Sequence, residues 1–418
     1  MNHLDRREFL RTVLAASTAG VMSSFYSYAA PKLGRNKITD IKVMTIQGPY
    51  GRTYTYVRVD SDSGHQGIGE AYGTPGAGVA DGIMALKPNF VGQDPLDIDV
   101  LYTVSEARRT DGSAHMLMRA MSGLEMATWD LAGQILNQPV AKLLGGRFRD
   151  RVRMYDHAAP RNMLDKASCR EWAQKVKADP AGFTGHKFSF QRTKVEGDIA
   201  KDPNNRILTM KELRQARQGF ENCREALGDE QDILVHCHWE YDVRTAVQIA
   251  EAVAPMKPYW LEDPLIVDYT ESWKRLAESS PVPICTGENL FRREGFKDFI
   301  VNSAIDFAHP DLRNSGGFLE TKRIADLAHI WGIPMATHNT GSLLCTIATA
   351  QWAGSIHDYT VGETVTGRGG WMDQILLMDK PPIRGGYIEL TDNPGIGYKL
   401  NPDVAKAHLA EGEKWWGD

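Results

Sequence analysis

Residues 260–264, Trp260-Leu261-Glu262-Asp263-Pro264, contain the pattern that decides the fold: a short apolar segment that ends in an acidic residue. The pattern returns along the chain. Six successive apolar segments end at, or just before, a residue able to act as a metal ligand, acid or base: His236, Glu262, Glu288, Asp311, His338 and Glu363. The gaps between these residues are 26, 26, 23, 27 and 25. One strand, one helix and two loops need about 25 to 30 residues, so each polar residue occupies the same place in successive units.

The segments around these residues alternate between short apolar strands and helical stretches. Helical stretches such as 243–254 and 319–329 separate the apolar segments. Strands are expected at residues 152–156, 185–190, 233–236, 259–262, 282–286, 305–309, 333–337 and 359–362. Eight strands alternating with helices predict an α/β fold with a (β/α)8-type barrel over residues 151–380. A doubly wound open sheet is the alternative, but no GxGxxG follows an early strand. The polar residues would then gather at the carboxyl-terminal mouth of the barrel, where such barrels place catalytic groups.

Residues 37–150 precede the barrel and show a different pattern. Strands are expected at 38–46, 54–60 and 66–72, and a helical period follows from about residue 79 to residue 137. This pattern predicts a separate α+β domain. The tail at 381–418 is rich in glycine and proline, and we expect it to pack back on that domain.

The first 30 residues do not fit either domain. Arg6 and Arg7 are followed by Phe9 and Leu10, an uncharged stretch over 12–30, and the small-residue exit Ser27-Tyr28-Ala29. This arrangement is typical of an export signal, and the paired arginines resemble the twin-arginine type. We therefore predict a periplasmic protein. A disordered basic tail and an anchor helix are the alternatives.

Composition narrows the possible partners. The net charge is −5 and no basic stripe is present, which argues against a nucleic-acid partner. Apolar residues make up 42% of the chain, enough for a large core, and no segment after residue 30 is apolar enough to span a membrane. The five widely spaced cysteines fit neither a dense disulfide framework nor a CxxC zinc site.

The polar residues at the strand ends divide into two chemical groups. His236, Glu262 and Glu288 follow three neighbouring strands and can converge on one cation, and two carboxylates suit a hard ion such as Mg²⁺. Asp311 and His338 follow the next strands, and a carboxylate beside an imidazole fixes its tautomer. A metal and a base that face one pocket suit removal of a proton next to a carboxylate.

At these residues the chain resembles the enolase superfamily, in its mandelate racemase-like branch. The resemblance covers nearly everything after the export signal. It is carried by Gly67-Ile68-Gly69-Glu70-Ala71, Glu262-Asp263-Pro264, Gly287-Glu288-Asn289, Pro310-Asp311 with Gly316-Gly317, His338-Asn339 and Glu363. It implies a capping domain whose loops close over the barrel, a bound divalent metal, and removal of the proton α to a carboxylate. It also implies a homo-oligomer, a small-molecule acid as partner and no organic cofactor.

The resemblance implies a role for each matching residue. Glu262 and Glu288 correspond to the second and third metal ligands. Asp311 and His338 correspond to the base dyad, in which His338 takes the proton. Glu363 corresponds to the acid that hydrogen-bonds the substrate carboxylate. The segments 47–53 and 73–78 correspond to the two specificity loops of the capping domain.

Two positions depart from the family pattern. The first metal ligand is usually Asp, and here it is His236. A neutral imidazole removes a negative charge and is softer, so Mn²⁺, Fe²⁺ or Zn²⁺ compete better with Mg²⁺, and the metal could even be absent. The family's racemases carry Lys-x-Lys on the second barrel strand, where this chain has Lys187-Phe188-Ser189. Lys187 can still point into the barrel, but without a second lysine two-sided racemisation by that route is not expected.

His238 then becomes informative, because it lies two residues beyond His236. In the family's acid-sugar dehydratases a histidine at this position donates a proton to the departing hydroxyl. His338 as base, His238 as acid and one metal are the parts of a β-elimination of water. The alternative is that His238 only lines the pocket. His157 and His309 can also reach a pocket at the mouth, whereas His186 is expected to point out of the barrel.

The leading hypothesis is a lyase that dehydrates a sugar acid. An epimerase or cycloisomerase acting on a related acid is the alternative within the family. A binding protein that has lost catalysis is a third reading, since His236 replaces a usual ligand. A zinc hydrolase is a fourth, because His236-Cys237-His238 resembles a His-x-His ligand pair.

Overall fold

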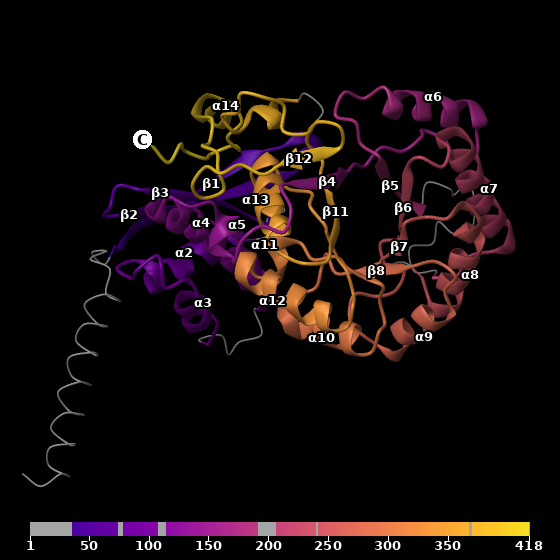
Figure 1. Cartoon of the computed structure of the whole chain (residues 1–418), viewed down its shortest axis with the longest axis horizontal. Coiled ribbons are helices and arrows are strands. Elements are labelled where there is room, and N and C mark those ends of the chain that lie inside the picture. The colour runs from indigo at the N-terminus through magenta and orange to yellow at the C-terminus, as the bar shows by residue number, and fades with distance from the viewer. Residues whose placement is uncertain are drawn as a thin grey trace, which may run out of the picture.

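A computed structural model of the chain describes residues 36–73, 78–107, 114–190, 206–239, 241–367 and 370–417 (Figure 1). The predicted export signal lies outside these residues. Within the described ranges, three strands form one sheet and nine form another. No helix in this part of the chain combines the length and the apolar character that a membrane span requires.

The smaller sheet belongs to the amino-terminal domain. Its strands β1, β2 and β3 pair antiparallel in sequence order, and three helices pack with them. The elements are β1 (Ile38–Gln47), β2 (Thr53–Ser61), β3 (Gln66–Ala71), α2 (Val79–Phe90), α3 (Ile98–Ala107) and α4 (Ala114–Leu136). Strand β3 lies directly on α4 because both surfaces are glycine-rich there. A Cβ on Gly69 would stand only 2.4 Å from the carbonyl oxygen of Gly123.

The larger sheet contains the predicted barrel. Strands β5 to β11 pair in parallel in sequence order, and β11 pairs with β4. The sheet closes between β4 and β5, where the Lys187 amide donates to the Asp156 carbonyl at 2.8 Å. The strands are β4 (Arg151–Tyr155), β5 (Gly185–Ser189), β6 (Asp232–His236), β7 (Trp260–Glu262), β8 (Ile284–Thr286), β9 (Phe307–Ala308), β10 (Met335–Thr337) and β11 (Tyr359–Glu363). The prediction of a (β/α)8-type barrel with an α+β capping domain is confirmed.

Helices cover the outside of the barrel, and α6 to α10 surround strands β5 to β8 in Figure 1. Local capping residues fix where several of them begin: Asp242 accepts from the Thr245 amide, and Thr209 with Glu212 forms a capping box. The helices are α5 (Val140–Leu143), α6 (Lys166–Lys177), α7 (Met210–Leu227), α8 (Val243–Val253), α9 (Glu271–Ser279), α10 (Arg292–Val301), α11 (Leu312–Ser315), α12 (Gly317–Ile330), α13 (Leu343–Gly354) and α14 (Pro402–Ala407). Short 3-10 turns are η1 (Pro49–Gly51), η4 (Ala254–Met256) and η5 (Trp371–Gln374).

The barrel interior is packed with side chains. Leu234 and Trp260 stand two residues before His236 and Glu262 and are fully buried. They belong to an interior cluster that also includes Tyr155, Cys285, Ala336 and Val361. Because this cluster fills the barrel, the polar side chains at the strand ends gather above it, at the mouth.

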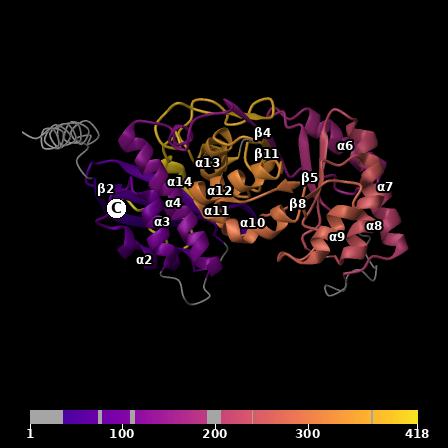
Figure 2. The same cartoon turned by 60° about the horizontal axis from the view of Figure 1, so that its bottom comes forward.

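The last part of the chain returns to the capping domain. Strand β12 (Tyr387–Glu389) pairs antiparallel with β4 on the outside of the barrel. Further on, the Ala410 amide donates to the Thr45 carbonyl at 2.9 Å, and the Lys42 ammonium donates to the Trp416 carbonyl at 3.0 Å. Figure 1 shows α14 lying beside β1, and Figure 2 shows α4 alongside α11 and α12.

Candidate active site at the barrel mouth

A cavity of about 470 Å³ lies at the carboxyl ends of the barrel strands, between the barrel and the capping domain. The predicted loop 47–53 forms part of its wall. Of the predicted loop 73–78, Gly73 lines the cavity, whereas residues 74–77 lie outside the described ranges. The wall is made by Gly51, Arg52, Thr53, Tyr54, Tyr72, Gly73, His157, Ala159, Lys187, Phe188, Ser189, His236, His238, Glu288, Arg313, His338 and Thr340. Asp311, Glu262 and Glu363 are fully buried just behind it.

Four side chains at the mouth form a cluster that fits a divalent cation. One donor atom from each of His236, Glu262, Asp263 and Glu288 lies within 4.8 Å of the others. Nε2 of His236 is 3.3 Å from Oδ2 of Asp263 and 3.7 Å from Oε2 of Glu288. All three atoms are buried and lack a hydrogen-bond partner among the described residues, which is the state expected of ligands arranged around a cation. The structure therefore brings together the three predicted ligands.

Asp263 also belongs to this cluster, although the sequence pattern does not predict it as a ligand. Its backbone has a φ of 50°, a conformation that is uncommon for a residue other than glycine. One carboxylate oxygen accepts a hydrogen bond from Thr286, and the other is the unpartnered Oδ2. Burial, followed by the charges of Glu288 and Glu262, raises the pKa of Asp263 well above its usual range.

His338 and Asp311 form the predicted dyad. Nδ1 of His338 is 2.8 Å from Oδ2 of Asp311. Although burial works the other way, Arg313 and His338 hold the pKa of Asp311 below its usual range, so Asp311 is a carboxylate that only accepts. Nδ1 must then carry the proton. Nε2 faces the cation cluster, 3.5 Å from Oε2 of Glu288.

The charges around His338 favour its protonated form. Burial alone would lower its pKa, but Glu288, Glu363 and Asp311 outweigh burial and raise it to about 9. Burial, with the charges of Glu262 and Glu363, raises the pKa of Glu288 to about 7, although His338 and Lys187 act to lower it.

Lys187 connects two of the buried carboxylates. Its ammonium group donates to Oε1 of Glu262 at 2.8 Å and to Oε2 of Glu363 at 3.0 Å. Burial opposes the positive charge, but these two partners raise the pKa of Lys187 above its usual value. Lys187 is therefore a fixed cation in this site, which makes it a poor proton acceptor.

Glu363 is surrounded by donors. Besides Lys187, it accepts from the hydroxyl of Tyr155 at 2.9 Å, and His157 contacts its other oxygen. Burial is outweighed by Lys187, His338 and His157, which hold the pKa of Glu363 well below its usual range. A role as a hydrogen-bond donor to a substrate carboxylate would need a proton that these contacts disfavour, so that role stays a prediction.

His238 lines the cavity beside the cation cluster. Its ring stacks on the ring of His236 with the centroids 3.6 Å apart. Its φ of 55° is again in the left-handed region, and such backbone strain concentrates at functional sites. Burial, followed by the charge of Lys187, lowers the pKa of His238. His238 and His338 thus line the same cavity, and the role of His238 as a proton donor stays a prediction.

The three other histidines weighed as site candidates lie in different surroundings. His157 lines the cavity, whereas His309 is fully buried beneath it and bonds with Tyr155 at 3.0 Å. His186 points out of the barrel, where Nδ1 lies 2.7 Å from Oδ1 of Asp156. The predicted outward direction of His186 agrees with this placement.

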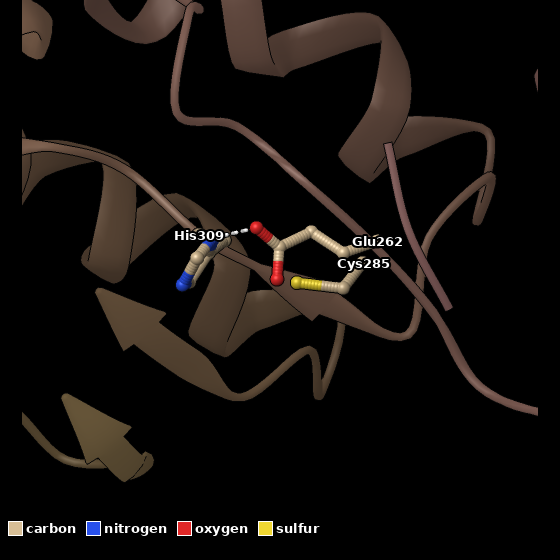
Figure 3. Close-up of side chains that lie close together, drawn as sticks. All are labelled: Glu262, Cys285 and His309. Carbon is tan, nitrogen blue, oxygen red and sulfur yellow. Dashed lines mark ion pairs between the residues drawn. The ribbon is translucent and has the colours of Figure 1, made fainter. Parts of the chain in front are cut away.

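Figure 3 shows that His309 also faces Glu262 and Cys285, with Nδ1 of His309 3.6 Å from Oε1 of Glu262. Glu262 belongs to this deeper group as well as to the cluster around His236. In the described part of the chain, the deeper group has one buried nitrogen or oxygen atom without a partner, Nδ1 of His309, whereas the cluster around His236 has three, so the cluster around His236 is the better candidate for a cation.

The fold and this site define a class: a capped (β/α)8 barrel in which a cluster of side chains suited to a cation and a histidine oriented by an aspartate face one cavity. Two sequence profiles match the chain, the mandelate racemase / muconate lactonizing enzyme N-terminal domain over residues 37–145 and the enolase C-terminal domain-like region over residues 168–404. The chain belongs to the mandelate racemase/muconate lactonizing enzyme family of the enolase superfamily.

Individual relatives agree with this assignment. D-xylonate dehydratase of Haloferax volcanii is 34% identical over 379 residues, which cover 90% of each chain. D-gluconate dehydratase of Thermoproteus tenax is 27% identical over 85% of this chain and 69% of its own length. Among solved structures, a mandelate racemase/muconate lactonizing enzyme-like protein from Rubrobacter xylanophilus superimposes with a TM-score of 0.83 at 29% identity, covering 92% of this chain and all of that one.

Proposed function

We propose that this protein is a sugar-acid dehydratase, a hydro-lyase that removes water from a polyhydroxy carboxylic acid. The observation that carries the proposal is the placement of His338: oriented by Asp311, it faces the cation cluster across a cavity that also presents His238. Relatives named as dehydratases of D-xylonate and D-gluconate act on this class of compound.

The chain's residues supply the two proton transfers. His338 takes the proton from the carbon next to the carboxylate, and the electron pair of that C–H bond moves first onto the carboxylate and then into the double bond to the next carbon. The hydroxyl on that next carbon leaves with a proton from His238, as water. The resulting enol takes up a solvent proton at carbon 3 and releases the proton of its carbon-2 hydroxyl to solvent, which gives a 2-oxo acid with a methylene group at carbon 3.

His236, Glu262, Asp263 and Glu288 are the residues that would hold a divalent cation. Such a cation supplies charge neutralisation for the substrate carboxylate and for Glu288, whose charge otherwise favours a second proton on His338. With three carboxylates and one imidazole, the donor set suits Mg²⁺, and the imidazole makes Mn²⁺, Fe²⁺ and Zn²⁺ competitive.

The wall of the cavity supports an anionic substrate. Arg52 and Lys187 bring positive charge to it, whereas Glu288 is the acidic residue of the wall. Ser189 lies where a second lysine base would stand, so the elimination is better supported than a two-base racemisation.

The test is turnover on a panel of aldonic and uronic acids, with metal analysis of the same preparation. We expect formation of a 2-oxo acid, detected as its semicarbazone, and loss of this activity after chelation with recovery on adding Mg²⁺ or Mn²⁺. A product that keeps all its hydroxyl groups would identify an isomerase. No turnover on any acid would favour a binding protein.

We further propose that the chain is exported by a twin-arginine signal. The support is Arg6-Arg7 followed by an uncharged stretch and a small-residue exit, all outside the described residues. Changing both arginines to lysine should leave the protein in the cytoplasm, as measured by cell fractionation. An unchanged periplasmic yield would remove the assignment.

A further inference from the structure

The carboxylate that orients His338 is itself held by an arginine. Arg313 lies on α11, two residues after Asp311. Its guanidinium donates two parallel hydrogen bonds to the carboxylate of Asp311, from Nε to Oδ1 at 3.1 Å and from Nη2 to Oδ2 at 2.7 Å. The amide of Arg313 also donates to Oδ1 at 2.8 Å. Oδ2 is the same oxygen that accepts from His338, so the position of the imidazole depends on the position of the guanidinium.

The guanidinium in turn is anchored in the other domain. Nη1 of Arg313 lies 3.2 Å from Oε1 of Glu70, which is on β3 of the capping domain. Glu70 is fully buried and also accepts from the amide and the hydroxyl of Ser342, the residue that caps α13. Tyr56 on β2 completes this group by donating to the Ser342 hydroxyl at 2.6 Å.

From these contacts we propose that Arg313 and Glu70 are positioning residues that tie the orientation of the catalytic base to the seating of the capping domain. The proposal rests on the proposed function, in which His338 is the base. The line of contacts runs from Glu70 through Arg313 and Asp311 to His338, and all four side chains are buried. A planar guanidinium bound on two sides fixes Asp311 more tightly than a contact with His338 alone would.

The arrangement also explains why these charges are tolerated inside the protein. Arg313 is 3% exposed and lies between two carboxylates, so no member of the group is left as an isolated buried charge. Tyr72 lies over the guanidinium with its ring centroid 4.7 Å from the central carbon. Tyr72 follows Glu70 by two residues and lines the cavity, so one short segment of the capping domain both shapes the substrate cavity and anchors the base.

Two conservative variants test the link. Arg313→Lys keeps the charge but cannot make the paired contact, and Glu70→Gln keeps the shape but removes the charge. Loss of an outer partner of a functional group typically costs about 10- to 100-fold, and we expect a loss of this size in kcat for Arg313→Lys and a smaller one for Glu70→Gln. KM and the affinity for Mn²⁺, measured by electron paramagnetic resonance, should stay within about 3-fold, since neither side chain belongs to the cation cluster. A rise in KM at unchanged kcat would instead make Arg313 a substrate-binding residue and overturn the proposal.

A matched control is available in the same interface. Glu125 is another fully buried carboxylate of the capping domain that bonds across to the barrel, to the amides of Phe318 and Leu319, but it does not touch the dyad. Glu125→Gln should therefore keep kcat. An equal loss of kcat in Glu125→Gln and Glu70→Gln would mean that any disturbance of the domain interface lowers activity, which would contradict a specific link.

The order in which Glu70 and Arg313 act on the dyad is tested by combining the variants. If Glu70 acts through Arg313, Glu70→Gln should add little in the Arg313→Lys background, whereas independent effects would multiply and overturn the link.

A readout without substrate is the ¹⁵N-histidine spectrum, in which the His338 signal is assigned by its loss in His338→Asn. That signal should shift in Arg313→Lys and Glu70→Gln but not in Glu125→Gln. An unchanged signal in all three refutes the link even if no sugar acid is turned over, so the two proposals fail separately.

Discussion

At the scale of single residues, the cluster around His236 still offers three carboxyl groups to a cation. Asp263 supplies one of them, and its unpartnered oxygen lies 3.3 Å from Nε2 of His236. Together with Glu262 and Glu288, the cluster keeps three carboxylates beside one imidazole. His236 therefore makes the site softer than a fourth carboxylate there would.

Changing His236 to Asp tests this account. The variant brings a fourth carboxylate into the cluster, so we expect tighter binding of Mg²⁺ relative to Zn²⁺, measured by calorimetric titration. Because the new carboxylate faces Asp263, the metal-free variant should melt at a lower temperature than the metal-free wild type and regain stability with Mg²⁺. An unchanged metal preference would show that His236 does not touch the metal.

His238 is expected to act in the second half of the reaction only. His238→Asn keeps the polar contact with the cavity but removes the acid, so elimination should fall by about 10²- to 10⁴-fold. Exchange of the α-proton with deuterated solvent should persist, since His338 and the cation cluster are unchanged. Full elimination by this variant would transfer the role to another group, with His157 tested next because it lines the same cavity.

The site residues at strand ends can be predicted from the sequence, because strand ends recur at a regular spacing along the chain. These residues are His236, Glu262, Glu288, Asp311, His338 and Glu363. Arg313, Glu70 and Tyr155 were missed as site partners because their roles depend on contacts across the fold, such as the link between β3 and α11. Asp263 carried a usable signal, since it directly follows a strand-end ligand.

At the scale of elements, the close approach of β3 to α4 shapes the capping domain. Gly69 faces the backbone of α4, where a Cβ would lie 2.6 Å from the Ala127 amide nitrogen. Gly69→Ala must push the strand and helix apart, and overpacking of this kind costs about 1–3 kcal/mol. We expect a lower melting temperature, measured by calorimetry. Gly64→Ala is a poor control because its φ is 79°, so Gly370→Ala, with open space at its Cβ, serves instead. Equal melting of Gly69→Ala and Gly370→Ala would contradict the packing.

The stability that the interface between α4 and α12 gives to the fold should depend on pH. Burial raises the pKa of Glu125 from 4.5 to about 8, although three donors favour its charge. Since the folded pKa is the higher one, this group's contribution to stability is fully present below pH 4.5 and is lost as the pH rises through 8. Melting temperatures from pH 5 to 9 should therefore fall more steeply for the wild type than for Glu125→Gln. Parallel curves would show that Glu125 is charged in the folded protein throughout.

The elements themselves were largely predictable, because alternating apolar segments and local caps specify them within the chain. The ends of the predicted strands lie within two residues of the ends of β4 to β11, although β9 is only Phe307–Ala308. The added strand β12 is not predicted by the sequence pattern. Its pairing with β4 joins segments far apart in the sequence, for which a local pattern carries no signal.

At the scale of the whole molecule, the cavity is a joint product of two domains. Arg52, Tyr54 and Tyr72 come from the capping domain, and His238 and His338 come from the barrel. Glu70 and Glu125 of the capping domain form buried hydrogen bonds with the barrel and so connect the two domains. Substitutions in the capping domain can therefore reshape the cavity while His238 and His338 keep their places on the barrel. Homo-oligomer formation stays a prediction.

The central claim is that His338 removes the α-proton of a sugar acid before water leaves. It is tested most directly by proton NMR of the best substrate of the panel in D₂O, with the wild type and with His338→Asn. We predict that the wild type forms a 2-oxo acid carrying one deuterium at carbon 3. His338→Asn should give neither this product nor any loss of the carbon-2 proton signal, because the remaining neighbour, Lys187, is held protonated by two glutamates. Full exchange of the carbon-2 proton by His338→Asn would contradict the account.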